Sequence, residues 1–501
     1  MAGAENGEAE SSVAASQQGL ETRRPYQVGG FFFARKQAMK EPPSVVLKFG
    51  GTSVQDAAAI RRLIHVVAAE SRRRVVVVSA LATVTDELCR LAASPVGTKT
   101  AGEALERLCA RHVGLVREVV DADRQSALIG RLDTLFRAAG DLASRPHERG
   151  MLARRDQLLA LGELASSAVL AEALVSAGLA ASWVDARRVI ATDDSFGAAR
   201  PDPAAIARAT RRVLPPLLGS GVIPVLGGFI GAAPDGATTT LGRGGSDYSA
   251  ALVAAALPAE EVQIWTDVDG VLTADPRIVT YAQRIPRLSF DEAYEMARFG
   301  ARVLHWGTLE PAAAHGIPVR VLDPRRPGSD GTLISAPDGA RGPAIAGLAH
   351  QSGVTVADVR ARGVAGSRRF LATALAWLDC DGRPATVLAL SQSRAIVSSP
   401  DARLIERFVA GLPDAAEAQV SHDAALIAVV GDNIAAHPRA WRELGAALDA
   451  GRLACVMPSQ SGHALVSVRA SGGAAAVIAH LHDRLVVPGA MRPCAAAGAC
   501  S

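Results

Sequence analysis

The sequence predicts an α/β fold, with an open, mainly parallel sheet that carries helices on both faces, followed by two smaller α+β units. Three observations predict it. The runs at 45–47 and 75–78 are apolar throughout and rich in valine, which is typical of strands buried on both faces. Alanine-rich helical stretches such as 57–69 separate these runs. After residue 345 the chain changes to shorter strand, helix and strand units, which suggest an internal duplication.

The remaining elements of the first part follow the same alternation. Each expected strand is a short, mainly apolar run, and each expected helix is a longer alanine-rich stretch between two runs. We expect further strands at 182–184, 222–226, 262–266 and 318–322, and helices at 158–177, 203–218 and 247–256. Residues 1–43 lack periodicity and are expected to be a disordered extension, and 488–501 a flexible tail.

The composition limits the class of protein. Hydrophobic residues make up 49% and charged residues 21% of the 501 residues, which excludes a wholly disordered or fibrous chain. The net charge of +3 does not favour nucleic acid or an anionic membrane as partner. Six cysteines without zinc spacing fit a reducing compartment, and the longest apolar run is too short to span a bilayer. We therefore expect a cytoplasmic protein that acts on small molecules.

The motif KFGGTS at 48–53 is the first candidate site. It stands between an expected strand and an expected helix, where adjacent glycines let backbone amides approach an anion. Lys48 is one of only four lysines, whereas the chain has 49 arginines. A lysine kept at this position is therefore expected to make a contact that arginine cannot make, such as a compact positive charge against a phosphate. The alternative is an ordinary tight turn.

Two further segments carry candidate residues. TTTLGRGGSD at 238–247 is a second glycine-rich turn that opens a helix, in which Arg243 suits a carboxylate and Asp247 suits Lys48 or an ammonium group. The alternative for Ser246 and Asp247 is a helix N-cap. WTDVDGVLTADPR at 265–277 ends a strand in an acidic loop, where Asp267 is a candidate nucleotide contact and a solvated turn is the alternative.

Taken together, these segments resemble the aspartate kinases of the amino-acid kinase superfamily. The resemblance runs from 45 to 334 and continues more weakly to 487. It also includes GFIG at 228–231 and FGARVLH at 299–305, in the expected order. Glutamate, acetylglutamate and nucleoside-monophosphate kinases share the fold, but the TTLGRGGSD and TDVDG pair with the tandem tail is similar to aspartate kinase.

The resemblance implies a catalytic domain at 44–336 that uses Mg-ATP to phosphorylate the β-carboxylate of L-aspartate, the first step of aspartate-family amino-acid biosynthesis. This carboxylate is ionised at neutral pH, so no general base is needed. Lys48 and Asp247 are the implied catalytic residues, and Mg²⁺ is expected on the nucleotide phosphates rather than in a protein metal site. The implied phosphate-binding residues are Gly50, Gly51, Gly244, Gly245 and Ser246.

Two sets of ligand contacts are also implied by the resemblance. The aspartate pocket comprises Ser79, Thr85, Glu163, Phe229 and Arg243. The ATP site comprises Thr266, Asp267, Asp275, Arg277 and Arg302. Ser79 and Thr85 have alternatives as strand-end and helix-cap hydroxyls, and Glu163 as a solvated helical charge. The sequence departs from the family pattern at Leu272, Arg302 and Trp306.

The tail is similar to tandem ACT domains, which sense amino acids and pair across subunits, so an effector and a homodimer or higher homo-oligomer are implied. The first module is expected at 345–423, completed by a strand at 485–487, and the second, inserted within it, at 424–484. The expected effector strand at 385–398 holds one arginine and no acid, which predicts weak inhibition by lysine. An acid from Asp358, Asp379 or Asp381 is the alternative.

Two other functions remain open from the sequence. One is a superfamily kinase that acts on another carboxylate. The other is a regulatory protein that binds an amino acid but does not catalyse a reaction. The pathway branch that the product would supply also stays open.

Overall fold

The computed structural model describes residues 43–486, apart from 147, 302–305, 337–344, 362–369, 371, 375, 378–384, 413–415, 451–452, 454, 460 and 471. The chain separates into two units, Met1–Pro42 and Pro43–Ser501, and the described residues belong to the second. The expected extension at 1–43, except Pro43, and the expected tail at 488–501 therefore lie outside the described residues.

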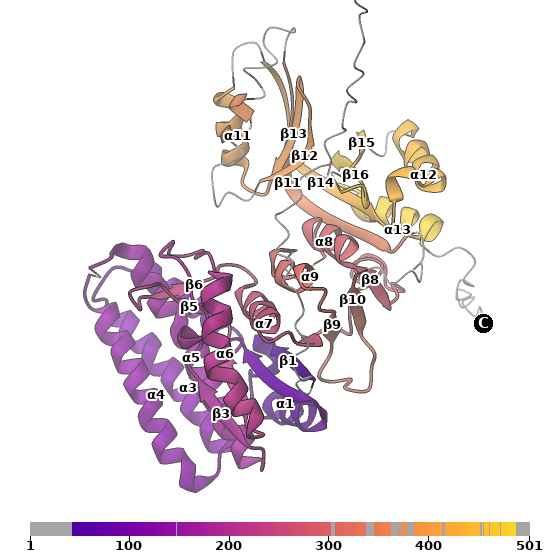
Figure 1. The fold of residues 1–501 in the computed structure, drawn as a ribbon. Coiled ribbons are helices and arrows are strands. Elements are labelled where there is room, and N and C mark those ends of the chain that lie inside the picture. The colour runs from indigo at the N-terminus through magenta and orange to yellow at the C-terminus, as the bar shows by residue number, and fades with distance from the viewer. Residues whose placement is uncertain are drawn as a thin grey trace, which may run out of the picture. The chain divides into compact units, whose positions relative to one another are not determined.

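An eight-stranded sheet forms the framework of the first part of the second unit (Figure 1). Its strand order is β3-β4-β2-β1-β7-β9-β10-β8. Every neighbouring pair from β3 to β9 is parallel, and β10 runs antiparallel to β9. The strands are β1 (Ser44–Phe49), β2 (Arg73–Val78), β3 (Ala181–Val184), β4 (Ile223–Gly227), β7 (Glu261–Trp265), β8 (Arg287–Ser289), β9 (Val319–Leu322) and β10 (Thr332–Ser335). The predicted mainly parallel sheet is confirmed.

Both faces of this sheet are buried. In β1, Val46 belongs to one hydrophobic cluster, while Val45 and Leu47 belong to the cluster on the opposite face. Because side chains alternate along a strand, a continuous apolar run is the sequence of a strand covered on both sides. The expected layers of helix, sheet and helix follow from this burial.

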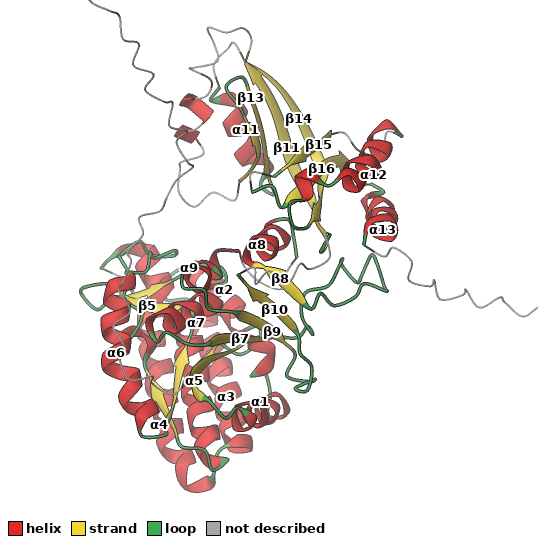
Figure 2. Ribbon diagram, turned by 45° about the vertical axis from the view of Figure 1, so that its right-hand side comes forward, coloured by secondary structure: helices red, strands yellow, loops and turns green. Residues whose placement is uncertain are grey.

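The helices divide between the two faces, as Figure 2 shows for the red ribbons around the yellow strands. Helices α1 to α5 contribute to the cluster that contains Leu47, and α6 to α9 to the cluster that contains Val46. They are α1 (Ala57–Ala69), α2 (Val84–Ala93), α3 (Lys99–Val119), α4 (Ala122–Ala143), α5 (Gly150–Ser176), α6 (Pro203–Gly219), α7 (Gly245–Ala256), α8 (Phe290–Arg298) and α9 (Glu310–Ala314). A small hairpin of β5 (Ile230–Ala232) and β6 (Thr238–Thr240) lies before α7.

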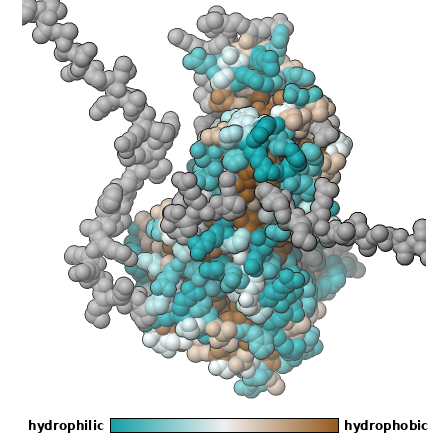
Figure 3. Space-filling view, turned by 90° about the vertical axis from the view of Figure 1, so that its right-hand side faces the viewer, coloured by the Kyte–Doolittle hydropathy of each residue, from teal (hydrophilic) through white to brown (hydrophobic). Residues whose placement is uncertain are grey.

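Helix α5 is the central helix of this part. By length and composition it could cross a bilayer, but 89% of its most apolar window is buried inside the protein. Its residues contribute to both hydrophobic clusters, which explains why it is apolar on all sides. The face in Figure 3, by contrast, is mainly hydrophilic with scattered apolar residues.

A six-stranded antiparallel sheet forms the second part of the unit, in the order β12-β13-β11-β14-β16-β15. Its strands are β11 (Gly347–Ala361), β12 (Thr386–Leu390), β13 (Arg394–Ser399), β14 (Ala416–Val430), β15 (Cys455–Pro458) and β16 (Ala464–Ala470). Its helices include α11 (Ala402–Ala410), α12 (Pro438–Asp449) and α13 (Ala474–Leu485).

The expected nesting of the two modules is wrong. The first half of β11 pairs with the end of β14, and the second half pairs with the beginning of β14 and with β13. The first module therefore lies within the second, and the second begins with the first half of β11. Leu485 ends helix α13 and Val486 follows in a turn, so they do not form the returning strand that was expected at 485–487. Val487 lies outside the described residues.

Candidate active site

Lys48 and Asp247 meet at the carboxyl end of the main sheet. Lys48 lies near the end of β1, and Asp247 lies in the first turn of α7. The Lys48 Nζ atom is 2.5 Å from Asp247 Oδ1, and their side chains are only 9% and 13% exposed. The predicted contact is confirmed, and it places a shielded positive charge beside the N-terminus of a helix.

Close packing of the loops explains the glycines around this pair. A Cβ atom on Gly51 would lie 2.9 Å from the carbonyl oxygen of Ala80, so no side chain fits there. Gly244 is the N-cap of α7 and has a φ of 69°, a conformation that favours glycine. The alternative role of Ser246 and Asp247 as N-cap is therefore wrong, because both lie inside the helix.

Some glycine amides of the two glycine-rich turns already donate hydrogen bonds within the chain, and others do not. The Gly50 amide donates to the Trp265 carbonyl at 3.1 Å, and the Gly245 amide donates to the Gly242 carbonyl at 3.1 Å. Both amides thus have an acceptor within the chain, and phosphate binding by Gly50 and Gly245 stays a prediction. Gly51 and Gly244 have no such acceptor in the described part of the chain, so their amides can serve an anion.

Glu163 on α5 lies buried in the same region. The residue is 3% exposed, and its Oε2 atom has no hydrogen-bond partner among the described residues. Burial raises the pKa of this carboxyl to about 8, against the lowering effects of the Ala80 amide and the Lys48 charge. A buried carboxylate without a full set of partners can bind a cation. The alternative of a solvated helical charge is wrong.

The other predicted aspartate contacts occupy the surrounding loops. Ser79 directly follows β2, and Thr85 is the second residue of α2, whose N-cap is Thr83. Phe229 adopts a φ of 65°, and its amide donates to the Ser249 hydroxyl at 2.9 Å. Arg243 is exposed, and no ion pair of its guanidinium occurs within the described residues. It is therefore available to a ligand.

The predicted nucleotide residues lie on the loop after β7. The Thr266 amide donates to the Leu322 carbonyl, and Asp267 is exposed. Asp275 and Arg277 form an ion pair at 2.5 Å. The hydrogen bond from the Arg277 side chain lowers the pKa of the Asp275 carboxyl. Arg302 lies outside the described residues.

Sequence reasoning missed two residues whose side chains hold segments near the site: Asp156 binds Gly197 and Thr240, and Arg325 binds the loop after β7. Asp156 on α5 is fully buried and accepts hydrogen bonds from the Gly197 amide and from both the amide and hydroxyl of Thr240 at 2.8–2.9 Å. Arg325 pairs with Asp323 at 2.8 Å and donates to the Asp267 carbonyl. Gly197 and Thr240 lie far from Asp156 in the sequence, and Asp267 lies far from Arg325, so no local pattern marks these contacts.

Within the ranges that the structure describes, no group of three histidine, cysteine, aspartate or glutamate residues is placed to hold a metal ion.

Comparison with known proteins identifies relatives over most of the chain. The amino acid kinase family model matches residues 43–323. Lysine-sensitive aspartokinase 3 of Escherichia coli (strain K12) is 34% identical over 461 residues, which cover 88% of this chain and 99% of that protein. An aspartokinase of Chlamydia trachomatis is 36% identical over 318 residues, or 62% of this chain and 70% of that protein.

Solved structures show the same similarity. E. coli aspartokinase III in complex with aspartate and ADP has a TM-score of 0.75 and 33% identity, covering 88% of this chain and all of that one. The same enzyme in complex with lysine and aspartate has a TM-score of 0.73 and 33% identity, covering 88% of this chain and 99% of that one.

Proposed function

The chain belongs to the aspartokinases of the amino acid kinase family, and we propose that it transfers the γ-phosphoryl group of Mg-ATP to the β-carboxylate of L-aspartate. The products are 4-phospho-L-aspartate and ADP. The observation that carries the proposal is the Lys48–Asp247 pair at 2.5 Å beside the buried, incompletely paired carboxyl of Glu163.

The transfer needs positioning and charge stabilisation rather than proton abstraction. The β-carboxylate of aspartate is ionised at neutral pH and attacks phosphorus directly. Lys48 neutralises charge on the moving phosphoryl group, and Asp247 holds its ammonium in place. The amides of Gly51 and Gly244 and the hydroxyl of Ser246 are placed to bind phosphate oxygens.

The substrate amino acid presents two further charges. We assign its α-ammonium to Glu163, because a cation would supply the partner that Oε2 lacks. We assign its α-carboxylate to Arg243, whose guanidinium is exposed beside two glycines and can form two parallel hydrogen bonds. Ser79, Thr85 and Phe229 complete the proposed pocket.

The nucleotide is assigned to the loop that carries Thr266, Asp267, Asp275 and Arg277, with Arg302. Mg²⁺ normally keeps much of its water and binds through substrate phosphates, so the family does not require a three-carboxylate cage. The residues present fit this arrangement, and the ion would neutralise phosphate charge when it is bound.

The antiparallel sheet is proposed to bind an amino-acid effector and to pair with a second copy of the chain. The similarity to an enzyme that was crystallised with lysine supports an effector, but not its identity. The free thiols of Cys89, Cys109 and Cys455 support a reducing compartment, for which we propose the cytoplasm.

One assay tests the activity. ADP release, coupled to a dehydrogenase, is measured with L-aspartate, L-glutamate and N-acetylglutamate in turn. We expect turnover with L-aspartate alone. Turnover with another acid would favour a different carboxylate kinase, and no turnover with any of them would favour a regulatory binding protein.

Arg243→Ala tests the substrate assignment. Because it removes a contact to the amino-acid carboxylate, we expect the aspartate KM to rise about tenfold or more and the ATP KM to change little. A rise in the ATP KM alone would place Arg243 in the nucleotide site instead.

A further inference from the structure

The segment that continues the proposed nucleotide loop is buried in the second regulatory module. Ala274 and Val279 are 3% and 0% exposed and belong to one hydrophobic cluster with Leu348 of β11 and Leu481 of α13. Ala274 and Val279 therefore pack in the core of the module, although the loop that carries them continues from β7 of the main sheet.

Thr273 forms the polar anchor of this contact. Its amide donates to the Gln283 carbonyl at 2.8 Å, and its carbonyl accepts from the Leu348 amide at 2.8 Å. Its hydroxyl accepts from the Gln283 amide at 3.0 Å and lies 2.9 Å from Nε2 of His482. Thr273 is 9% exposed and His482 is fully buried.

The Thr273 hydroxyl and Nε2 of His482 share one hydrogen bond, in which either group can donate, depending on the imidazole tautomer. Nδ1 of His482 has no hydrogen-bond partner among the described residues. Both tautomers are uncharged. Burial lowers the pKa of its imidazole, against the raising effect of the Asp483 charge, which favours this neutral form.

A second contact holds the other end of the segment. The Tyr281 hydroxyl donates to the Asp483 carboxylate. The Tyr281 ring also meets the His482 ring edge-on, with 5.6 Å between centroids. Two neighbouring residues of α13 thus hold both ends of residues 273–281.

The position of Thr273 connects this anchor to the nucleotide loop. It lies six residues after Asp267 and two before Asp275 in the sequence. We propose that His482 is a positioning residue for the nucleotide loop, so that the second regulatory module completes the ATP site. This inference rests on the proposed function, because the assignment of the loop to ATP comes from there.

Paired substitutions test the role of the hydrogen bond. Thr273→Val and His482→Leu remove it, and we expect each to raise the ATP KM about tenfold while the aspartate KM stays within about twofold of wild type. Thr273→Ser keeps the hydroxyl, and His482→Gln keeps a group near the Nε2 position that can donate or accept, so both should restore most of the affinity for ATP. His480→Gln is the matched control, because His480 is exposed on the same helix.

The ratio of the two KM values separates positioning from mere loss of folded protein. A smaller folded fraction lowers the apparent kcat but leaves both KM values unchanged. An ATP KM at the wild-type value in Thr273→Val and His482→Leu would overturn the inference, as would equal rises for both substrates.

Calorimetric titration with ATP in the absence of aspartate measures ATP affinity directly, so it tests the role of His482 independently of the proposed reaction. Weaker ATP binding in Thr273→Val than in wild type and His480→Gln supports it, even if wild type phosphorylates no aspartate. Equal ATP binding in all three proteins overturns it, even if aspartate kinase activity is confirmed.

Discussion

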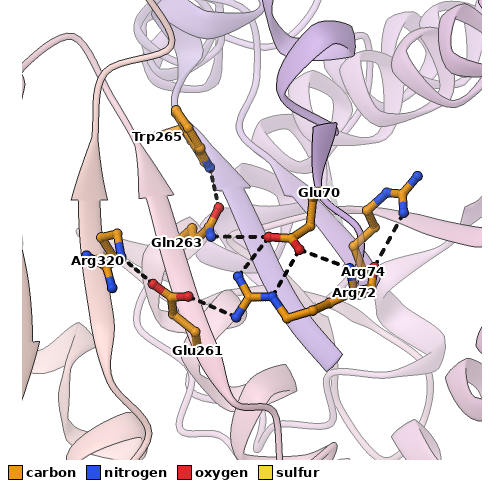
Figure 4. A network of polar contacts seen from close by, with 7 residues as sticks. All are labelled: Glu70, Arg72, Arg74, Glu261, Gln263, Trp265 and Arg320. Atoms are coloured by element: carbon orange, nitrogen blue, oxygen red, sulfur yellow. Dashed lines mark hydrogen bonds and ion pairs between the residues drawn. The ribbon is translucent and has the colours of Figure 1, made fainter. Parts of the chain in front are cut away.

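Carboxyl groups at the two ends of the main sheet differ in whether they have partners. At the amino ends of β2 and β7, Arg72 donates to Glu70 at 2.7 Å and to Glu261 at 3.0 Å, and Glu261 also pairs with Arg320 (Figure 4). At the carboxyl ends, Glu163 keeps an oxygen without a partner in the described residues. The carboxylates of Glu70 and Glu261 are paired with arginines and stabilise the fold, whereas a carboxylate oxygen without a partner is available to a ligand.

The largest expected effect comes from the carboxyl end. Lys48→Ala should lower kcat about 100- to 1,000-fold, because the ammonium acts on charge that develops in the transition state. Lys48→Arg should also be severely impaired, since a planar guanidinium does not replace a compact ammonium. Steady-state kinetics and thermal unfolding are measured together. Turnover within a few-fold of wild type in a folded Lys48→Ala protein would contradict the assigned role.

Glu163 predicts a dependence of aspartate binding on pH. With a pKa of about 8, its carboxyl is mainly protonated below that pH in the ligand-free protein. An ammonium ligand needs the carboxylate, so the aspartate KM should fall as pH rises toward 8, by up to about tenfold per unit. In Glu163→Gln we expect a raised aspartate KM without this slope. A wild-type KM that does not change between pH 6 and 8 would argue against the assignment.

The same carboxyl also affects stability, and the sign follows from its raised pKa. The folded protein retains the proton at pH values where the unfolded chain, with a reference pKa of 4.5, has lost it. The contribution of Glu163 to the free energy of unfolding therefore decreases as pH rises from about 4.5 to 8. Denaturant unfolding of wild type and Glu163→Gln across this range isolates the contribution.

A smaller effect, on stability alone, is expected at the amino end. Arg72→Ala leaves Glu70 and Glu261 without a shared partner and should lower the free energy of unfolding by about 2 kcal/mol. The values of kcat and KM should stay within about twofold, because the cluster lies away from the proposed ligands. Arg137→Ala, which removes an exposed arginine, is the control for urea unfolding. A selective loss of activity in Arg72→Ala would remove the contrast between the two ends.

The smallest effect is expected from lysine. Asp358, one of the acids that could have met a lysine side chain, is paired with Arg394 at 2.7 Å, and this hydrogen bond lowers the pKa of its carboxyl. Asp379 and Asp381 lie outside the described residues. Because Asp358 already has its counter-charge, millimolar lysine should change the rate at low aspartate by less than about twofold. Strong inhibition at micromolar lysine would show that another acid serves the effector.

Much of the first part could be predicted because the strands at the centre of the sheet, such as β1 and β2, contain continuous apolar runs. The start of α5 was predicted eight residues late, since Asp156 and its charged neighbours suggest a solvated segment. Burial of Asp156 depends on amides of Gly197 and Thr240, which no local pattern reveals. Lys48 and Asp247 were assigned from glycine-rich turns, whereas the interest in Glu163 came only from the family resemblance.

The nesting of the two modules could not be predicted for a different reason. Both modules use similar strand and helix units, so the sequence does not determine which half of a strand pairs with which partner. Here the long strand β11 belongs to both modules, and the register along β14 divides it near Gly353. The last strand of the first module was therefore expected at 485–487, whereas the structure has it at the beginning of β14.

This division has a topological consequence. Ser352 and Ala425 are direct partners across β11 and β14, so the two points where the first module leaves and re-enters the second are adjacent. Opposed residues in an antiparallel pair lie about 5 Å apart, a gap that a two-residue hairpin spans. The first module is thus an insertion whose two ends lie side by side, and the contact between Thr273 and His482 lies outside the inserted β12, β13 and α11.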